Sequence, residues 1–222
     1  MRGKRIAASR ALTWAVMGNG RDRLVWIDCE MTGLDIARDE LVEVAVVITD
    51  FELNLIGPGF DVVIAPSQEA LDNMGEFVRN MHSVSGLLEE LPNGITLDEA
   101  QTQVLAYIRE HVPTAKAAPI AGNSIGTDRT FLAKYMPLVD DHLHYRSVDV
   151  STIKELSRHW FPRAYFNSPE KHGGHRATAD ILESIRELRY YREAVFVSKP
   201  GPSTDDVKAV AERVVSQFTP HL

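Results

Sequence analysis

Hydrophobic positions along the 222-residue chain fall into two kinds of run. Short apolar runs that end at glycine, proline or polar turns predict buried strands. Longer segments with apolar residues three and four positions apart predict amphipathic helices. The predicted strands are residues 24–30, 40–50, 59–66, 118–122 and 145–150, and the predicted helices are residues 74–81, 85–91, 96–112, 126–136, 151–160 and 176–196.

The order of these elements predicts the fold class. Short turns join the first three strands, which favours an antiparallel meander. Helices and strands then alternate, so we expect an α/β fold with a mixed five-stranded sheet and helices on both faces. Residues 23–197 would form one folded domain and residues 1–22 a disordered extension. Residues 198–222 would form a linker and a final amphipathic helix, a candidate clasp on a neighbouring molecule, with apolar residues Val207, Val210, Val214 and Phe218.

Composition limits the possible partners. The chain is 44% hydrophobic and 25% charged, as in ordinary globular proteins. No apolar run approaches the roughly 20 residues that a membrane span needs. A single cysteine, Cys29, excludes a disulfide within the chain and favours a reducing compartment. The net charge of −7 argues against a protein that grips long nucleic acid through many phosphates. We therefore predict a cytoplasmic protein with no membrane partner. The basic, acid-free residues 1–16 leave a mitochondrial transit segment as the alternative.

Two carboxylates end the first predicted strand, in the stretch LVWIDCEM. Side chains alternate along a strand, so Asp28 and Glu30 share one face and Cys29 points to the other. Like charges this close stay ionised together only when a positive group lies between them, and a divalent cation with oxygen ligands meets that need. The alternative is that both acids lie just past the sheet edge, in solvent.

Two further acids and a histidine complete the candidate chemistry. Asp128, in GNSIGTDRTFL, falls in the first turn of a predicted helix, where an aspartate is also favoured by the helix dipole alone. In HRATAD, His175 and Asp180 are about 140° apart around a helix and do not share a face. We place His175 in the Gly-rich loop 167–175, above a site that Asp180 faces from the helix. His172, in the same loop, is the competing candidate.

Together the four acids predict a catalytic metal centre. They can hold two divalent cations, Mg²⁺ or Mn²⁺, about 3.5–4 Å apart, which activate a water and stabilise the leaving oxygen. A histidine that titrates near neutrality can take the proton of the water. This chemistry is typical of phosphodiester hydrolysis.

The stretches WIDCEMTGLD, GNSIGTDRTFL, YRSVDVSTIKEL and HRATADILESIRELRYY resemble the oligoribonuclease family, which belongs to the DEDDh group of 3′→5′ exonucleases with a ribonuclease H-like fold. The resemblance covers residues 23–203. It implies hydrolysis of very short RNAs, chiefly dinucleotides, from the 3′ end to 5′-mononucleotides. By motif, the metal ligands would be Asp28, Glu30, Asp128 and Asp180, and the general base would be His175.

The resemblance also implies a substrate pocket completed by a homodimer. Leu34 would wedge between the two bases, and Tyr145 would stack on a base from the other subunit. The substrate's 5′ phosphate would be capped by Ser124, Arg146, Ser151 and Thr152. Phe77 stands where many relatives carry tryptophan, which implies weaker or rearranged base stacking there. From the residues alone, Tyr145 and Arg146 are equally explained as a surface aromatic–cation pair.

Three rival functions remain open at the level of sequence. A proofreading-type DNA exonuclease has the same four acids but needs basic or aromatic residues along a strand channel. A silent module that sequesters dinucleotides would bind without turnover. A glycosidase with paired carboxylates has no need of four acids and a loop histidine.

Overall fold

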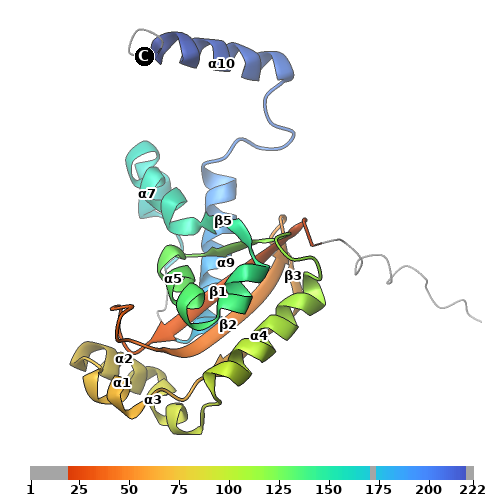
Figure 1. Ribbon diagram of the computed structural model, residues 1–222. Helices are drawn as coiled ribbons and strands as arrows, with labels where there is room; N and C mark the ends of the chain where they lie inside the picture. The colour runs from red at the N-terminus through yellow and green to blue at the C-terminus, as the bar shows by residue number, and fades with distance from the viewer. Residues whose placement is uncertain (1–19, 171–173, 219–222) are drawn as a thin grey trace, which may run out of the picture.

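The computed structural model describes residues 20–170 and 174–218 (Figure 1). Residues 1–19, most of the expected N-terminal extension, and His172 lie outside the described residues. The predicted localisation, which depends on residues 1–16, therefore stays a prediction.

A five-stranded sheet forms the centre of the fold, in the order β3-β2-β1-β4-β5. Strand β1 (Arg23–Met31) pairs antiparallel with β2 (Leu41–Asp50), which pairs antiparallel with β3 (Leu55–Val63). On the other side, β1 runs parallel to β4 (Pro119–Gly122), and β4 runs parallel to β5 (His144–Asp149). The predicted meander and the mixed sheet are both confirmed.

Helices cover both faces of this sheet (Figure 1). One face packs on α4 (Leu97–His111), α5 (Gly126–Tyr135) and α6 (Pro137–His142), and the other on α7 (Val150–Trp160) and α9 (Ala177–Ala194). The remaining helices are α1 (Gln68–Asn73), α2 (Glu76–Ser85), α3 (Leu87–Glu90), the 3₁₀ turn η1 (Leu91–Asn93), α8 (Pro162–Phe166) and α10 (Thr204–Phe218).

Local sequence explains why α4 begins and packs where it does. Thr96 accepts a hydrogen bond from the backbone N–H of Glu99, whose carboxylate in turn accepts the backbone N–H of Thr96. This reciprocal capping satisfies N–H groups that the first helical turn leaves without partners. The helix then buries one stripe against the sheet, formed by Ala100, Val104, Tyr107 and Ile108.

The sequence prediction was wrong in three local places. Strand β3 covers residues 55–63 rather than 59–66. The glycines and proline at 57–59 suggested a turn, but an edge strand tolerates them because one side of its backbone makes no ladder bonds. Helices α1, α6 and α8 were not predicted, since each has fewer residues than a periodic pattern needs. The helix predicted over residues 74–81 is α2, over Glu76–Ser85, and its buried residue is His82, which the apolar pattern did not include.

The chain leaves the sheet through α9 and ends in α10, which stands apart from the other helices (Figure 1). The final amphipathic helix is thus present over Thr204–Phe218. Its apolar residues Val207, Val210 and Val214 are 43–46% exposed. A clasp on a neighbouring molecule and the domain boundaries remain predictions. Among the described residues, no helix has the length and apolar character needed to cross a membrane.

Candidate active site

Strand β1 changes from core to carboxylates along a single face. Its even-numbered residues Leu24 and Trp26 are buried against α9, and the same face continues through Asp28 and Glu30 at the end of the strand. The odd-numbered Cys29 points into the opposite core with Val25 and Ile27. Both acids therefore lie within the strand, with Asp28 half-buried and Glu30 buried. The alternative, that both acids lie in solvent past the sheet edge, is wrong.

Asp180 joins this pair from the first turns of α9. One carboxylate oxygen from each of Asp28, Glu30 and Asp180 lies within 4.8 Å of the other two. Three hard oxygen donors at this spacing suit a divalent cation, which prefers carboxylate ligands. This geometry supports divalent-metal binding at the end of β1.

Asp128 lies beside the cluster and is tied to the same strand. Its Oδ1 atom accepts a hydrogen bond of 2.9 Å from the backbone N–H of Cys29. This bond ties the first turn of α5 to the backbone of β1 at Cys29, the residue between Asp28 and Glu30. A helix-dipole role alone does not explain this contact, because Asp128 is buried and faces the sheet.

Burial and mutual repulsion make these acids hold protons. Burial raises the pKa of Asp28 to about 9, with further increases from the charges of Asp128 and Glu30. Burial and the neighbouring Glu43 raise the pKa of Glu30 to about 8. The pKa of Asp128 rises to about 7, mainly through burial. A bound cation would favour the ionised forms, so metal binding and proton release are coupled at this site.

We expect the metal-free protein to lose stability as the pH rises. The folded protein holds these protons to a higher pH than the unfolded chain, so its free energy of unfolding falls between about pH 4 and about pH 9. Asp28→Asn removes the most strongly shifted group and should flatten this fall. Urea unfolding in chelator, measured across that range, tests it. Asp72→Asn, at an exposed position on α1, is the control, and an unchanged slope for Asp28→Asn would contradict the expectation.

His175 lies at the entrance to α9, where the sequence placed it. It is exposed, precedes the helix and has a left-handed backbone conformation with φ of 47°. The backbone N–H of Ala177, two residues after His175, donates to Glu43, and Glu43 lies directly opposite Glu30 in the sheet. The chain therefore enters α9, directly after His175, next to the acidic end of β1.

Two residues of the expected phosphate cap, Ser124 and Ser151, are in contact. The backbone N–H of Ser124 donates to Oγ of Ser151 at 3.0 Å, and the two hydroxyl oxygens are 3.2 Å apart. Both residues meet at the N-terminus of α7, where Asp149 also accepts the N–H groups of Ser124 and Ser151. Thr152 is exposed on the first turn of the same helix.

The expected base-contacting residues are exposed and come from three different segments of the chain. Leu34, Phe77 and Tyr145 are 75%, 81% and 74% exposed and come from the loop after β1, from α2 and from β5. The guanidinium of Arg146 lies over the ring of Tyr145, 5.4 Å from its centre. The aromatic–cation pair considered from the sequence is therefore present in the chain.

Sequence reasoning missed two buried polar residues next to the cluster. Glu43 lies opposite Glu30 in the ladder between β1 and β2. Nε2 of His82 donates to the carbonyl oxygen of Met31, 2.8 Å away. An acid within the apolar run LVEVAVV was a signal for Glu43. His82 lay in an amphipathic segment whose register the pattern did not fix.

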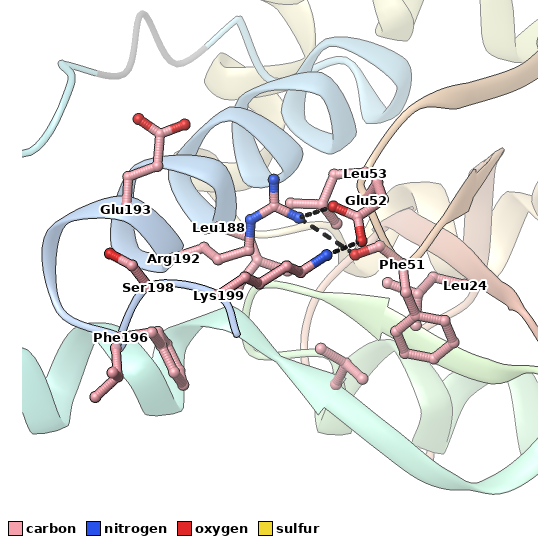
Figure 2. Close-up of a pocket in the computed structure, with 12 residues that line it drawn as sticks. Leu24, Phe51, Glu52, Leu53, Leu188, Arg192, Glu193, Phe196, Ser198 and Lys199 are labelled. Carbon is pink, nitrogen blue, oxygen red and sulfur yellow. Dashed lines mark hydrogen bonds and ion pairs between the residues drawn. The ribbon is translucent and has the colours of Figure 1, made fainter. Parts of the chain in front are cut away.

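A pocket lies where the start of β1 meets the end of α9 (Figure 2). Leu24 at the start of β1, the turn after β2 and the end of α9 line this apolar pocket. Arg192 and Lys199 both pair with Glu52 at its rim. Because β1 and α9 carry the acids at their opposite ends, this pocket is separate from the candidate active site.

Comparisons with known proteins agree with this architecture. A family model described as Exonuclease matches residues 25–188. The oligoribonuclease of Leifsonia xyli subsp. xyli is 62% identical over 206 residues, covering 93% of this chain and 100% of that protein. The oligoribonuclease of Streptomyces coelicolor is 61% identical over 194 residues, covering 87% of this chain and 97% of that protein.

Solved structures show the same fold at low identity. E. coli exonuclease I in complex with a dT13 oligonucleotide matches with a TM-score of 0.61 and 15% identity over 78% of this chain. Exonuclease I from Methylocaldum szegediense matches with a TM-score of 0.59 and 20% identity over 78% of this chain. In both cases this chain spans 41% of the larger protein.

The sheet order and the matching family model define the class, an exonuclease domain with a ribonuclease H-like fold. Within that class, the chain belongs to the oligoribonuclease family. It is therefore a hydrolase, a 3′→5′ exoribonuclease.

Proposed function

We propose that this enzyme hydrolyses short oligoribonucleotides, chiefly dinucleotides, to 5′-mononucleotides with two divalent cations and a histidine base. The observation that carries the proposal is the convergence of Asp28, Glu30 and Asp180 within 4.8 Å, with Asp128 and His175 beside them. The intact set of acids and the exposed histidine distinguish an enzyme from a silent binding module.

The chain's own residues have separate tasks in this reaction. Asp28, Glu30, Asp128 and Asp180 would hold the cations. Two Mg²⁺ or Mn²⁺ ions would supply activation of the attacking water and stabilisation of the leaving oxygen. His175 would take the proton of that water, which its exposed position beside the cluster permits.

Charge and local geometry favour a short substrate. The net charge of −7 gives little attraction for a long phosphate backbone. Near the N-terminus of α7, the hydroxyls of Ser124 and Ser151 lie side by side and suit a terminal phosphate. Arg146 can add a bidentate contact when it leaves the Tyr145 ring. Leu34 and Phe77 would contact the bases, and Thr152 would add a hydroxyl to the phosphate cap.

We expect dinucleotides to have the highest kcat/KM and a 5′ phosphate to increase it. Product analysis with labelled RNAs of two to ten nucleotides, with and without Mg²⁺, measures both effects. Arg146→Ala should erase the advantage of the 5′ phosphate and leave cleavage of unphosphorylated dinucleotides unchanged. Arg158→Ala, on α7, is the matched control. Cleavage of the ten-nucleotide RNA as fast as, or faster than, the dinucleotide would contradict this expectation. It would favour an open strand channel, as in a proofreading-type DNA exonuclease.

We further propose a homodimer in which each subunit completes the other's pocket. Tyr145 is exposed on the edge strand β5, where a second subunit has access to it. Two-fold symmetry would make the exchange reciprocal. Arg146, on the same strand, would act in the same way.

Mixed dimers of two inactive variants should regain activity. In a dimer of Asp28→Asn and Tyr145→Ala, a tyrosine that acts in the partner leaves one site with every group intact. A tyrosine that acts in its own subunit leaves a defect in both sites. Turnover after subunit exchange, with mixed dimers shown by mass spectrometry, separates these cases. Absence of recovery would contradict the shared site.

A further inference from the structure

Glu43 is a buried acid near the start of β2, the strand next to the one that carries Asp28 and Glu30. It is 2% exposed and lies directly opposite Glu30 in the antiparallel ladder. A buried carboxylate needs hydrogen-bond or charge partners, because burial without them is costly. The partners of Glu43 come from the start of α9.

Both carboxylate oxygens of Glu43 contact the two residues that follow His175. Nε of Arg176 donates to Oε1 at 3.0 Å, and Nη2 lies 2.9 Å from the same oxygen. The backbone N–H of Ala177 donates to Oε2 at 3.1 Å. Arg176 occupies the N-cap position of α9, so Glu43 supplies the capping carboxylate from another element.

The same arginine reaches a third element. Its Nη1 and Nη2 atoms donate to the two oxygens of Glu90 on α3, at 2.8 and 3.0 Å. The guanidinium fork is thus shared between an acid of β2 and an acid of α3. Glu90 is half exposed, whereas Glu43 is enclosed. The inner pair therefore fixes the start of α9 more firmly than the outer pair does.

We propose that Glu43, through Arg176 and Ala177, is a positioning residue that sets the place of His175 over the acidic cluster. His175 has positive φ, a conformation that a residue with a side chain keeps only when its surroundings hold it. The Gly-rich loop precedes His175, so the anchored residues are those that follow it. This inference rests on the proposed role of His175 as general base.

A double-variant cycle separates positioning from a purely structural role. Glu43→Gln keeps the shape and an oxygen for the N–H of Ala177 but removes the charge that holds Arg176. We expect its kcat on a dinucleotide to fall about tenfold to a hundredfold with KM little changed, since small misplacement of a catalytic group has effects of that size. In a His175→Ala background, the same substitution should cost less than about threefold, because the base it positions is already absent.

Two further variants keep the test decisive. Glu90→Gln, at the exposed end of the same arginine, is the matched control and should retain nearly full kcat. Arg176→Lys keeps the charge but loses the fork, and should show an intermediate loss even if Glu43→Gln folds poorly. Circular dichroism and thermal melts establish folding for each.

Three outcomes distinguish the possible failures. Full kcat in both Glu43→Gln and Arg176→Lys, together with a large loss of kcat in His175→Ala, would overturn the positioning role and leave the proposed base in place. If Glu43→Gln lowered kcat by the same factor with and without His175, the role of Glu43 would be structural and the positioning role would be overturned. Full activity of His175→Ala would overturn the proposed base itself, and the positioning role with it.

Discussion

Asp28→Asn should slow hydrolysis about a thousandfold or more while the protein stays folded. Removing one carboxylate from the site misplaces a cation that contributes several kcal/mol to transition-state stabilisation, and about 4 kcal/mol corresponds to a thousandfold. Folding should survive because the substitution replaces an acid whose ionisation is unfavourable in the buried, mutually repulsive cluster. Glu30→Gln, Asp128→Asn and Asp180→Asn should behave in the same way.

Turnover of a dinucleotide at saturating Mn²⁺ and calorimetric titration with Mn²⁺ measure this prediction together. Asp61→Asn is the matched control. Asp61 is an exposed aspartate on β3, and Ala45 of β2 lies between it and Asp28 in the sheet. It should keep full activity and metal affinity. Any of the four variants that kept most of its activity would remove its residue from the proposed site.

His175→Ala should lower kcat by roughly 10²–10⁴-fold with little change in metal affinity. This is the usual effect of losing a general base. Metal affinity should change little because the cluster of candidate metal ligands consists of Asp28, Glu30 and Asp180 and does not include His175. Added imidazole should restore part of the rate of the variant.

Two histidine variants test the assignment within the chain. His159→Ala, at an exposed position on α7, should leave kcat unchanged. His172→Ala should also have a small effect, although His172 lies outside the described residues. A larger loss for His172→Ala than for His175→Ala would transfer the role of base to the earlier histidine.

The sequence determined the elements whose physical signals are local. The buried run before Asp28 predicted β1, and the alternation of side chains put Asp28 and Glu30 on one face, as the structure confirms. Thr96 and Glu99 marked the start of α4 by their capping pattern. These features follow from neighbours a few residues apart in the chain, so single-sequence reasoning has access to them.

Only the tertiary structure decided the features that depend on contacts between distant segments. Edge position, rather than composition, lets β3 run through residues 57–59. Packing of one side of α2 buried His82, a polar residue that the apolar pattern did not include. The packing of α9 against β1 brought Asp180 to Asp28 and Glu30, and it placed Arg176 on Glu43. Hydrophobic burial and ion pairing act through space, so residues more than a hundred positions apart meet without a signal in either local segment.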